Sequence, residues 1–353
     1  MQGDEGSPAP ASLPNRTKRS CKRPDEMRSK FLVLALSTLA SGLLIAGHAR
    51  AFESVDTRGS RILGLDDARI EHDGETHTAS NLGTLVVVGT DAYATKTNTS
   101  KGPGWTAFYK IADFLGPNPV VTTHTVRVQG EGAPADMGHG NGLAYANGAF
   151  YLAMIHKPGE YQVAQLDGNG QVVRQLKVQQ GKIGKQAASI TPYRDGKFII
   201  GTAGENVEKG AKENLVVLKP YYIASIEGDA FQLGEKFYVP TTGTYNVGQA
   251  THYSPGADEL LVPVWDGKGV AGAATGRGNR IIVVKLGVVK DDATYEPVRW
   301  LGYTPAESEV EKFEFEGIAQ AADGEIYVSA NVTDIEGKSA DGIYRVVRRT
   351  EFP

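Results

Sequence analysis

The stretch HGNGLAYANGAFYLA, His139 to Ala153, decides the fold class. Polar residues and glycines precede an apolar run, and Asn147-Gly148 separates this run from a second one rich in aromatic and aliphatic residues. Asn-Gly between two strand-forming runs is the strongest short-range signal of a β-hairpin. The stretch therefore predicts two antiparallel strands joined by a tight turn.

The same rhythm recurs along the chain. It returns in QAASITPYRDGKFIIGT from Gln186, in QATHYSPGADELLVPVW from Gln249 and in EGIAQAADGEIYVSA from Glu316, and less closely in HTASNLGTLVVVGT from His77. Successive starts lie 47 to 67 residues apart, and no long amphipathic helix interrupts them. This pattern predicts a single-domain, all-β fold, a β-propeller in which four-stranded blades surround a central channel.

Five blades of about sixty residues fit the spacing best, although blades of ~40–50 residues are more usual. The segment EGDAFQLGEKFYVPTTG from Glu227 could open another blade, so six blades are the alternative. A β-sandwich or jelly roll also contains many short strands. Those folds give no reason for a polar residue before each apolar run.

The repeats also predict a candidate site. In a propeller the innermost strands run in one direction along the channel, so the residues that precede them converge on one mouth, where a concave surface can bind a ligand. The residues expected there are His139, Gln186, Gln249, Glu316 and His77, with Asn141 and His252 further in. A structural alternative is that these side chains join neighbouring blades by hydrogen bonds and close the channel.

Three of these residues could hold one divalent cation. His139, His252 and Glu316, together with a glutamine carbonyl oxygen, would suit Zn²⁺, Mn²⁺ or Fe²⁺, and a more oxygen-rich variant would suit Ca²⁺. One divalent cation is the cofactor that these residue types suggest, and the sequence leaves the cofactor otherwise unknown.

Hydrolysis or elimination of a polysaccharide is the second chemistry that these residue types permit. Hydrolysis needs two opposed carboxylates, for which Glu316 and Asp229 are candidates, with Asp136 behind them. Elimination needs a base and an acid, and a cation to neutralise a uronate. The candidates are His139 or His252 as base, Tyr253 or Tyr145 as acid, and Arg194 or Lys157 as cation. The residues expected to bind substrate are Asn141, Gln186, Gln249, Tyr253, Arg194 and Trp265.

The N-terminal region predicts export. Residues 27–51 contain two basic residues, an apolar run and Ala49-Arg50-Ala51, the features of a signal peptide cleaved near Ala51. The apolar run is shorter than the ~20 residues of a membrane span. Residues 1–26 read as a disordered extension or an incorrectly assigned start, and residues 52–353 as the propeller domain of a secreted or periplasmic protein.

Composition narrows the function classes. Cys21 is the only cysteine and lies ahead of the predicted cleavage site, so the mature chain lacks thiol catalysis and cysteine-ligated metals. Residues 1–51 hold eight of the 37 Lys and Arg and four of the 41 Asp and Glu, which leaves 29 against 37, a net charge of −8. An acidic chain without a basic stripe argues against nucleic acid or anionic lipid as the partner. We expect a monomer without stable membrane insertion.

The repeats HGNGLAYANGAFYLA and FEGIAQAADGEIYVSAN resemble the blades of secreted bacterial propeller proteins, a broad group with polysaccharide lyases, lactonases, five-bladed glycosidases and helveticin-like bacteriocins. The segment GDAFQLGEKFYVPTTG is similar to an inner strand of the glycosidases, in which an aspartate enters the channel. By this resemblance Asp229 would be that residue, although the first blade has no equivalent aspartate. The resemblance lies in residues that form blades, not in catalytic ones.

Two classes of function follow from these features. One is an exported carbohydrate-active enzyme, a lyase or glycoside hydrolase acting at the channel mouth. The other is an extracellular protein that binds cell-wall glycan or another surface partner without turnover.

Overall fold

The computed structural model describes residues 53–98, 103–155, 159–210, 216–242, 245–247, 250–266, 279–305 and 310–348. Residues 1–26 and 27–51, as well as Lys157 and Gln249, lie outside them. Across these ranges almost all regular structure is β-strand, and the one helical element is a single 3₁₀ turn, η3 (Arg194–Gly196). No helix in the part of the chain described here has the length and apolar character needed to cross a membrane.

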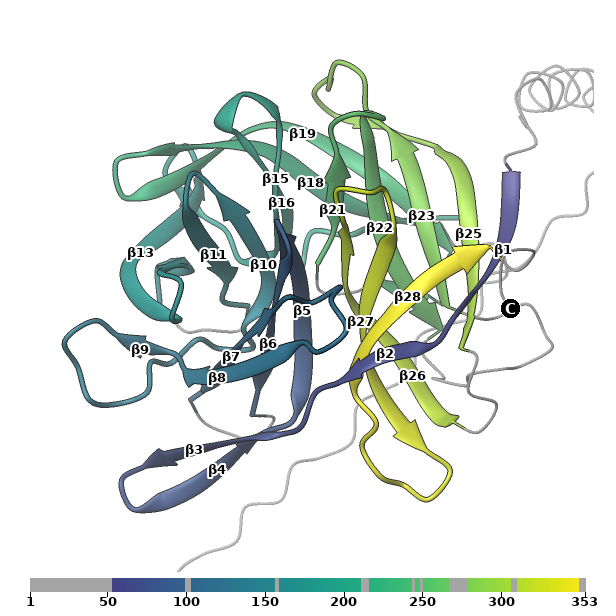
Figure 1. Ribbon diagram of the computed structural model, residues 1–353. Helices are drawn as coiled ribbons and strands as arrows, with labels where there is room; N and C mark the ends of the chain where they lie inside the picture. Colours follow the sequence, from purple (N-terminus) through teal and green to yellow (C-terminus); the bar gives the residue numbers. More distant parts are fainter. Residues whose placement is uncertain are drawn as a thin grey trace, which may run out of the picture. The chain divides into compact units, whose positions relative to one another are not determined.

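Most strands fall into five antiparallel groups that follow one another in chain order (Figure 1). The first group is β5 (Asn81–Val88), β6 (Asp91–Thr97), β7 (Thr106–Ala112) and β8 (Val120–Thr125). The second is β10 (Asn141–Ala146), β11 (Ala149–Ala153), β12 (Tyr161–Leu166) and β13 (Gln171–Gln180). The third is β15 (Ala187–Pro192), β16 (Phe198–Thr202), β18 (Val216–Glu227) and β19 (Ala230–Thr242).

The last two groups complete the series. The fourth is β21 (His252–Ser254), β22 (Glu259–Asp266), β23 (Asn279–Lys285) and β25 (Pro297–Pro305). The fifth is β26 (Val310–Gln320), β27 (Ile326–Asp334), β28 (Gly342–Arg348) and β2 (Arg61–Gly64). The remaining strands are β1 (Glu53–Gly59), β3 (Ala68–His72), β4 (Glu75–Ala79), β9 (Arg127–Val128), β14 (Ile183–Gly184), β17 (Val207–Lys209), β20 (Tyr245–Val247) and β24 (Ala293–Thr294).

The first strands of the five groups form a closed ring. Strand β5 contacts β10, β10 contacts β15, β15 contacts β21, β21 contacts β26, and β26 returns to β5. Four-stranded sheets arranged around such a ring define a β-propeller, so the predicted fold class is confirmed. The ring is closed by the N-terminal part of the chain, because β1 pairs in parallel with β25 while β1 and β2 both pair with β28.

A β-bulge explains the rhythm of the repeats. The register shifts at the same point of four inner strands, at Gly83, Gly142, Ala188 and Glu316. A bulge inserts one unpaired residue and bends the strand, and small residues accommodate it most easily. Three of the four bulged positions carry Gly or Ala. The fourth carries Glu316, so a carboxyl-bearing side chain lies at the bulge of β26.

The predicted hairpins form as expected where local turn chemistry controls them. Asn147 and Gly148 have φ of 52° and 79° in the two-residue turn between β10 and β11. Positive φ at both positions is the requirement of a type I′ turn, which Asn-Gly satisfies at low cost. Two other segments differ from their predictions. His77 lies on β4, in a separate hairpin with β3, and the inner strand begins only at Asn81.

The segment from Glu227 does not open a blade. It forms the turn and the outer hairpin that join β18 to β19 within the third group. The alternative of a sixth blade starting at Glu227 was wrong. An outer hairpin with a glycine turn has the same local sequence signature as an inner hairpin.

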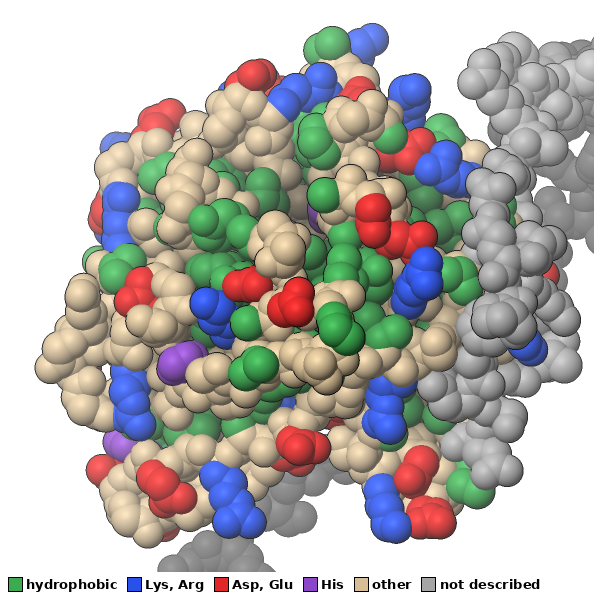
Figure 2. Space-filling model, viewed as in Figure 1, with side chains coloured by type: hydrophobic (Ala, Val, Ile, Leu, Met, Phe, Trp, Pro, Cys, Tyr) green, Lys and Arg blue, Asp and Glu red, His purple; other side chains and the backbone are tan. Residues whose placement is uncertain are grey.

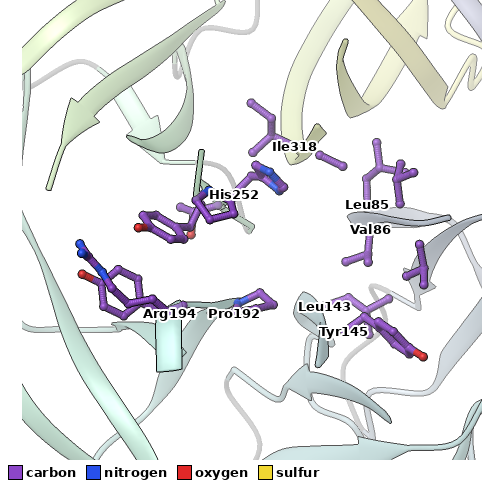
Figure 3. Close-up of a pocket in the computed structure, with 15 residues that line it drawn as sticks. Leu85, Val86, Leu143, Tyr145, Pro192, Arg194, His252 and Ile318 are labelled. Atoms are coloured by element: carbon purple, nitrogen blue, oxygen red, sulfur yellow. The ribbon is translucent and has the colours of Figure 1, made fainter. Parts of the chain in front are cut away.

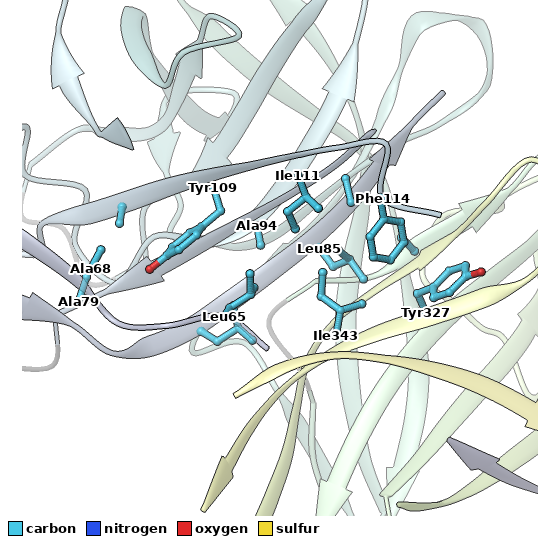
Figure 4. Close-up of a cluster of buried hydrophobic side chains, with 14 of the residues drawn as sticks. Leu65, Ala68, Ala79, Leu85, Ala94, Tyr109, Ile111, Phe114, Tyr327 and Ile343 are labelled. Carbon is cyan, nitrogen blue, oxygen red and sulfur yellow. The ribbon is translucent and has the colours of Figure 1, made fainter. Parts of the chain in front are cut away.

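Hydrophobic clusters fill the spaces between neighbouring sheets. Figure 4 shows one of them, in which Ile111 and Phe114 from the first group pack with Tyr327 and Ile343 from the fifth. Leu65 of the N-terminal part of the chain is 3% exposed in the same cluster. Packing therefore holds the first group, the fifth group and the N-terminal segment together, at the point where the ring closes.

Candidate functional site

The loop before β10 has a conformation that requires its glycines. Gly138 and Gly140 both have φ of 57°. A Cβ atom at Gly140 would lie 2.7 Å from the Thr106 hydroxyl and 2.8 Å from that of Thr97. The loop thus packs directly against β6 and β7, and the backbone N–H of His139 donates to the Ile155 carbonyl at 2.7 Å. These contacts hold the His139 ring in a defined position.

Asp136 supports this loop and does not act as a second acid. Its Oδ1 accepts hydrogen bonds from the backbone N–H groups of Gly104 and Gly138, both at 2.9 Å. Its carboxylate is thereby engaged in holding the turn.

His139 and Glu316 belong to one hydrogen-bonded network, which we call the Asn–His–Glu network: Asn81, His139, Glu316 and Asn331. His139 Nε2 lies 2.7 Å from Asn81 Nδ2. Asn331 Nδ2 lies 2.9 Å from Asn81 Oδ1 and 2.7 Å from Glu316 Oε1. The network connects the loop before β10 with β5, β26 and β27, so it joins three of the five groups.

The direction of these hydrogen bonds defines the state of His139. Asn81 Oδ1 accepts from Asn331, so the Asn81 amide nitrogen donates to His139 Nε2. Nε2 is then an acceptor, and the imidazole proton resides on Nδ1. In this arrangement Nε2 of His139 is already engaged and is not presented as a base to a ligand.

Glu316 is the buried end of the network. It is 4% exposed, and burial raises the pKa of its carboxyl group well above the usual value, while the hydrogen bond from Asn331 opposes this effect. Burial therefore favours the neutral form of the Glu316 carboxyl group, compared with an exposed glutamate. Carboxylic acids that are kept neutral by burial can act as proton donors, but they also occur as purely structural groups.

The predicted ring of mouth residues is only partly assembled. The structure connects His139 with Glu316 through two asparagines that the sequence analysis missed. Asn81 could have been found from the repeat pattern. It lies two residues before the bulged Gly83 of β5, and Asn141 lies one residue before the bulged Gly142 of β10. Asn331 carries no local signal, since it lies inside an ordinary strand, β27. Gln186 directly precedes β15, and its backbone carbonyl accepts a hydrogen bond from the Ala203 N–H.

His77 lies elsewhere. Its ring packs edge-on against Trp105, with a centroid distance of 4.1 Å, on the outer hairpin β3–β4. The expectation that it lines the channel mouth was wrong, because its repeat starts four residues later than predicted.

The channel contains an apolar cavity of about 270 Å³. Figure 3 shows Leu85, Leu143, Pro192 and Ile318 around this space, with His252 directed into it. These residues come from the inner strands of all five groups, so the cavity lies where the groups converge. His252 therefore faces a different space from the Asn–His–Glu network.

Burial lowers the pKa of His252 to about 4. The unfolded chain has an ordinary histidine pKa, so the unfolded state binds the proton more readily between these values. The stability that this neutral histidine contributes is present above about pH 6.5 and is lost as the pH falls towards 4. We expect His252→Gln to remove up to about 3 kcal/mol of this pH dependence, as measured by urea unfolding at pH 4.5 and 7.5. Equal pH slopes in both proteins would contradict a buried neutral His252.

Two residues that were predicted to bind substrate, Arg194 and Tyr253, both donate hydrogen bonds to Asp258. Arg194 donates to Asp258 Oδ1 at 2.8 Å, and the Tyr253 hydroxyl donates to the same oxygen at 2.8 Å. This cluster joins the third and fourth groups beside the cavity. These contacts engage the two side chains that were predicted as the uronate cation and the general acid of an elimination. Of the alternatives, Tyr145 lines the apolar cavity and Lys157 lies outside the described residues.

Asp229 was expected in the channel, and this placement was wrong. It lies exposed in the turn between β18 and β19, 3.6 Å from Lys177 Nζ on β13. The outer hairpin carries it away from the inner strands, so it cannot oppose Glu316 as a second carboxylate. Trp265 is half-buried on β22 and packs against the hydrophobic cluster between the fourth and fifth groups. Tyr145 lines the cavity.

The candidate metal ligands do not meet. No three histidine or acidic side chains come together as a possible metal site within the described ranges. His252 faces the apolar cavity, and His139 and Glu316 are separated by the two asparagines.

A second cavity of about 240 Å³ lies between the second and third groups, and its lining mixes polar with apolar side chains; we call it the polar cleft. Its polar lining consists of Asn141, Ser189, Thr202, Asn206 and Lys219. Asn141 is 7% exposed, and its Oδ1 has no hydrogen-bond partner in the described structure. Buried polar atoms almost always have a partner, so an unpaired acceptor on a residue that lines a cavity is a candidate contact for a ligand.

Small residues open the polar cleft. Gly201 lies between Ser189 and Tyr221, and a Cβ atom there would come within 2.4 Å of the Ser189 hydroxyl. Gly204 and Ala188 also line the space. Amide, hydroxyl and amine groups therefore lie at a cavity that glycine and alanine keep open, together with the apolar side chains of Ile155 and Pro220.

No family model and no curated protein sequence matches the chain. Among solved structures, it is similar to xylan β-1,4-xylosidase from Bacillus halodurans C-125, with a TM-score of 0.46 and 13% identity over 76% of this chain and 53% of that one. An engineered GH43 glycoside hydrolase with endo-xylanase and exo-arabinofuranosidase activity gives a TM-score of 0.46, 15% identity, and 76% and 52% coverage. The chain thus spans about half the length of both.

A Cellvibrio cellulosa α-L-arabinanase mutant is similar at a TM-score of 0.41 and 10% identity, over 75% of this chain and 90% of that one. All three TM-scores are below 0.5, so the activities of these proteins are not transferred to this chain.

Proposed function

We propose that this chain is a carbohydrate-active protein that binds a saccharide in the polar cleft. The observation that carries the proposal is the buried, unpartnered Asn141 Oδ1 in a cavity lined by further amide and hydroxyl groups. Sugar hydroxyls both donate and accept hydrogen bonds, so they match such a lining. The cavity is smaller than the ~300–1,000 Å³ of sites for drug-sized ligands, which suits one sugar residue of a chain.

Replacement of Asn141 by leucine tests this proposal. Leucine has a similar size but removes the acceptor, so we expect saccharide affinity to fall by about tenfold, the value of one hydrogen bond to a buried group. The melting temperature should stay the same or rise, because an unsatisfied buried oxygen is removed. Glycan-array binding and calorimetry of wild type and variant measure the effect. An unchanged affinity would assign the saccharide to another surface.

Turnover is a second candidate, favoured by the raised pKa of the buried Glu316 carboxyl group. A glycoside hydrolase would use this group to protonate the leaving oxygen. In that case Glu316→Gln should abolish the release of reducing ends from a polysaccharide panel while saccharide binding persists. The burial of Glu316 and the position of Asp229 favour binding without turnover. Export remains a prediction from residues 27–51.

A further inference from the structure

The polar cleft contains a cation without an anionic partner. Lys219 lines the cleft from β18, and no carboxylate of the described residues lies within ion-pair distance of it. Most other lysines of the third group are exposed or form an ion pair. Lys185, for example, pairs with Glu205. Burial of Lys219 lowers the pKa of its amine, so the folded protein holds a cation that is incompletely solvated and uncompensated.

Such a position is unusual for this surface. On the face shown in Figure 2, Lys and Arg side chains are interspersed with Asp and Glu, without a large field of one sign. An ammonium group that is partly removed from water is costly unless an anion pairs with it. Within the described residues no carboxylate forms an ion pair with Lys219, so a bound ligand could supply the anion.

The same cleft offers an acceptor as well as the cation. Asn141 Oδ1 can accept a hydrogen bond from a hydroxyl group but would repel a carboxylate. A ligand that satisfies both groups must carry at least one hydroxyl donor and one anionic group. A uronic acid residue has both on a single ring.

We infer that the polar cleft recognises a carboxylated sugar, with its carboxylate on Lys219 and a hydroxyl on Asn141. This inference rests on the proposed saccharide site and specifies its ligand class. The pairing of Lys219 with a carboxylate is a charge-assisted hydrogen bond, which is about twice as strong as a neutral one. It therefore determines the preference for acidic over neutral sugar.

Calorimetry with D-glucuronic acid and D-glucose as probes tests the inference, using wild type, Lys219→Met and Lys219→Arg. We expect wild type to bind glucuronic acid at least about tenfold more tightly than glucose. Lys219→Met should lose this preference and keep its affinity for glucose, while Lys219→Arg should retain most of the preference. Removal of an unpaired, desolvated cation should not lower the melting temperature of Lys219→Met, which separates loss of binding from unfolding. Lys197→Met, an exposed lysine of the same group, is the matched control and should bind as wild type does.

The outcomes separate the two proposals. Equal affinity of wild type for both sugars, or a preference that persists in Lys219→Met, would overturn the role of Lys219 and leave the saccharide site intact. Failure of both probes to bind up to ~10 mM, together with an empty glycan array, would overturn the saccharide site itself. A preference that is lost in Lys219→Met and retained in Lys219→Arg and Lys197→Met supports the inference.

Discussion

Replacement of Lys96 by methionine is expected to destabilise the propeller by about 3–5 kcal/mol, the typical cost of breaking a buried ion pair. Lys96 lies on β6 and is fully buried, yet its Nζ lies 2.7 Å from Asp67 Oδ1 and 2.9 Å from Asp341 Oδ2. Asp67 belongs to the segment between β2 and β3, and Asp341 precedes β28. The ion triad therefore ties the first group, the fifth group and the N-terminal segment together where the ring closes.

Most of the loss in stability is expected to come from Asp341, which would lose its cationic partner. The Asp341 side chain is 5% exposed, so without Lys96 it would be a buried carboxylate without a cation. The double variant Lys96→Met with Asp341→Asn should recover at least half of the loss, because asparagine keeps the oxygen that accepts the Val332 N–H at 2.8 Å. Urea unfolding of the two variants measures both effects.

Lys110→Met is the matched control. Lys110 is on the neighbouring β7, its side chain is 40% exposed, and it lies 3.9 Å from Asp91. Exposed pairs of this kind contribute about 0–1 kcal/mol. A loss in Lys96→Met no larger than in this control would show that the triad does not stabilise the closure.

The pH dependence of stability is expected to change when Glu316 is replaced by glutamine. Glu316 has a raised pKa in the folded protein and an ordinary one in the unfolded chain. The stability that it contributes is therefore complete below about pH 4.5 and is lost as the pH rises through the folded pKa, at up to about 1.4 kcal/mol per pH unit. Glutamine keeps an acceptor for Asn331 but cannot ionise.

We expect the two proteins to have similar stability near pH 5, and Glu316→Gln to become the more stable protein as the pH rises, because glutamine cannot ionise in the buried site. Urea unfolding at pH 5, 6, 7 and 8 gives the two curves. Glu336→Gln serves as the control, since the Glu336 side chain is 64% exposed and pairs with Lys338. Parallel curves for wild type and Glu316→Gln would mean that Glu316 is ionised in the folded protein. A lower stability of Glu316→Gln at every pH would mean that glutamine does not replace the acid in the network.

The contacts of His139 and Glu316 indicate what the residues predicted at the channel mouth do. The Asn–His–Glu network joins three groups and occupies Nε2 of His139, so much of its role is structural, as one of the two interpretations of the sequence anticipated. The polar cleft beside it offers groups without partners. Binding of a ligand is therefore expected there, and not at the atoms that the network already satisfies.

The sequence by itself determined the strands, their hairpins and the propeller. The turn at Asn147-Gly148 and the small residue before each apolar pair are local features, and local backbone preferences act in the same way wherever the strand lies. The repeat pattern located polar positions close to the inner strands for the same reason: His139 precedes β10, and Glu316 lies at the bulge within β26.

Only the tertiary structure decided which of these side chains meet. Asn331 and Asn81 are 250 residues apart and become neighbours because the ring closes between β26 and β5. Lys96 and Lys219 look like ordinary surface lysines in ATKTN and VLKPY, and Asp229 looks like an inner-strand residue. Their burial, partners and placement depend on the register between strands that are distant along the chain, and no local preference encodes that register.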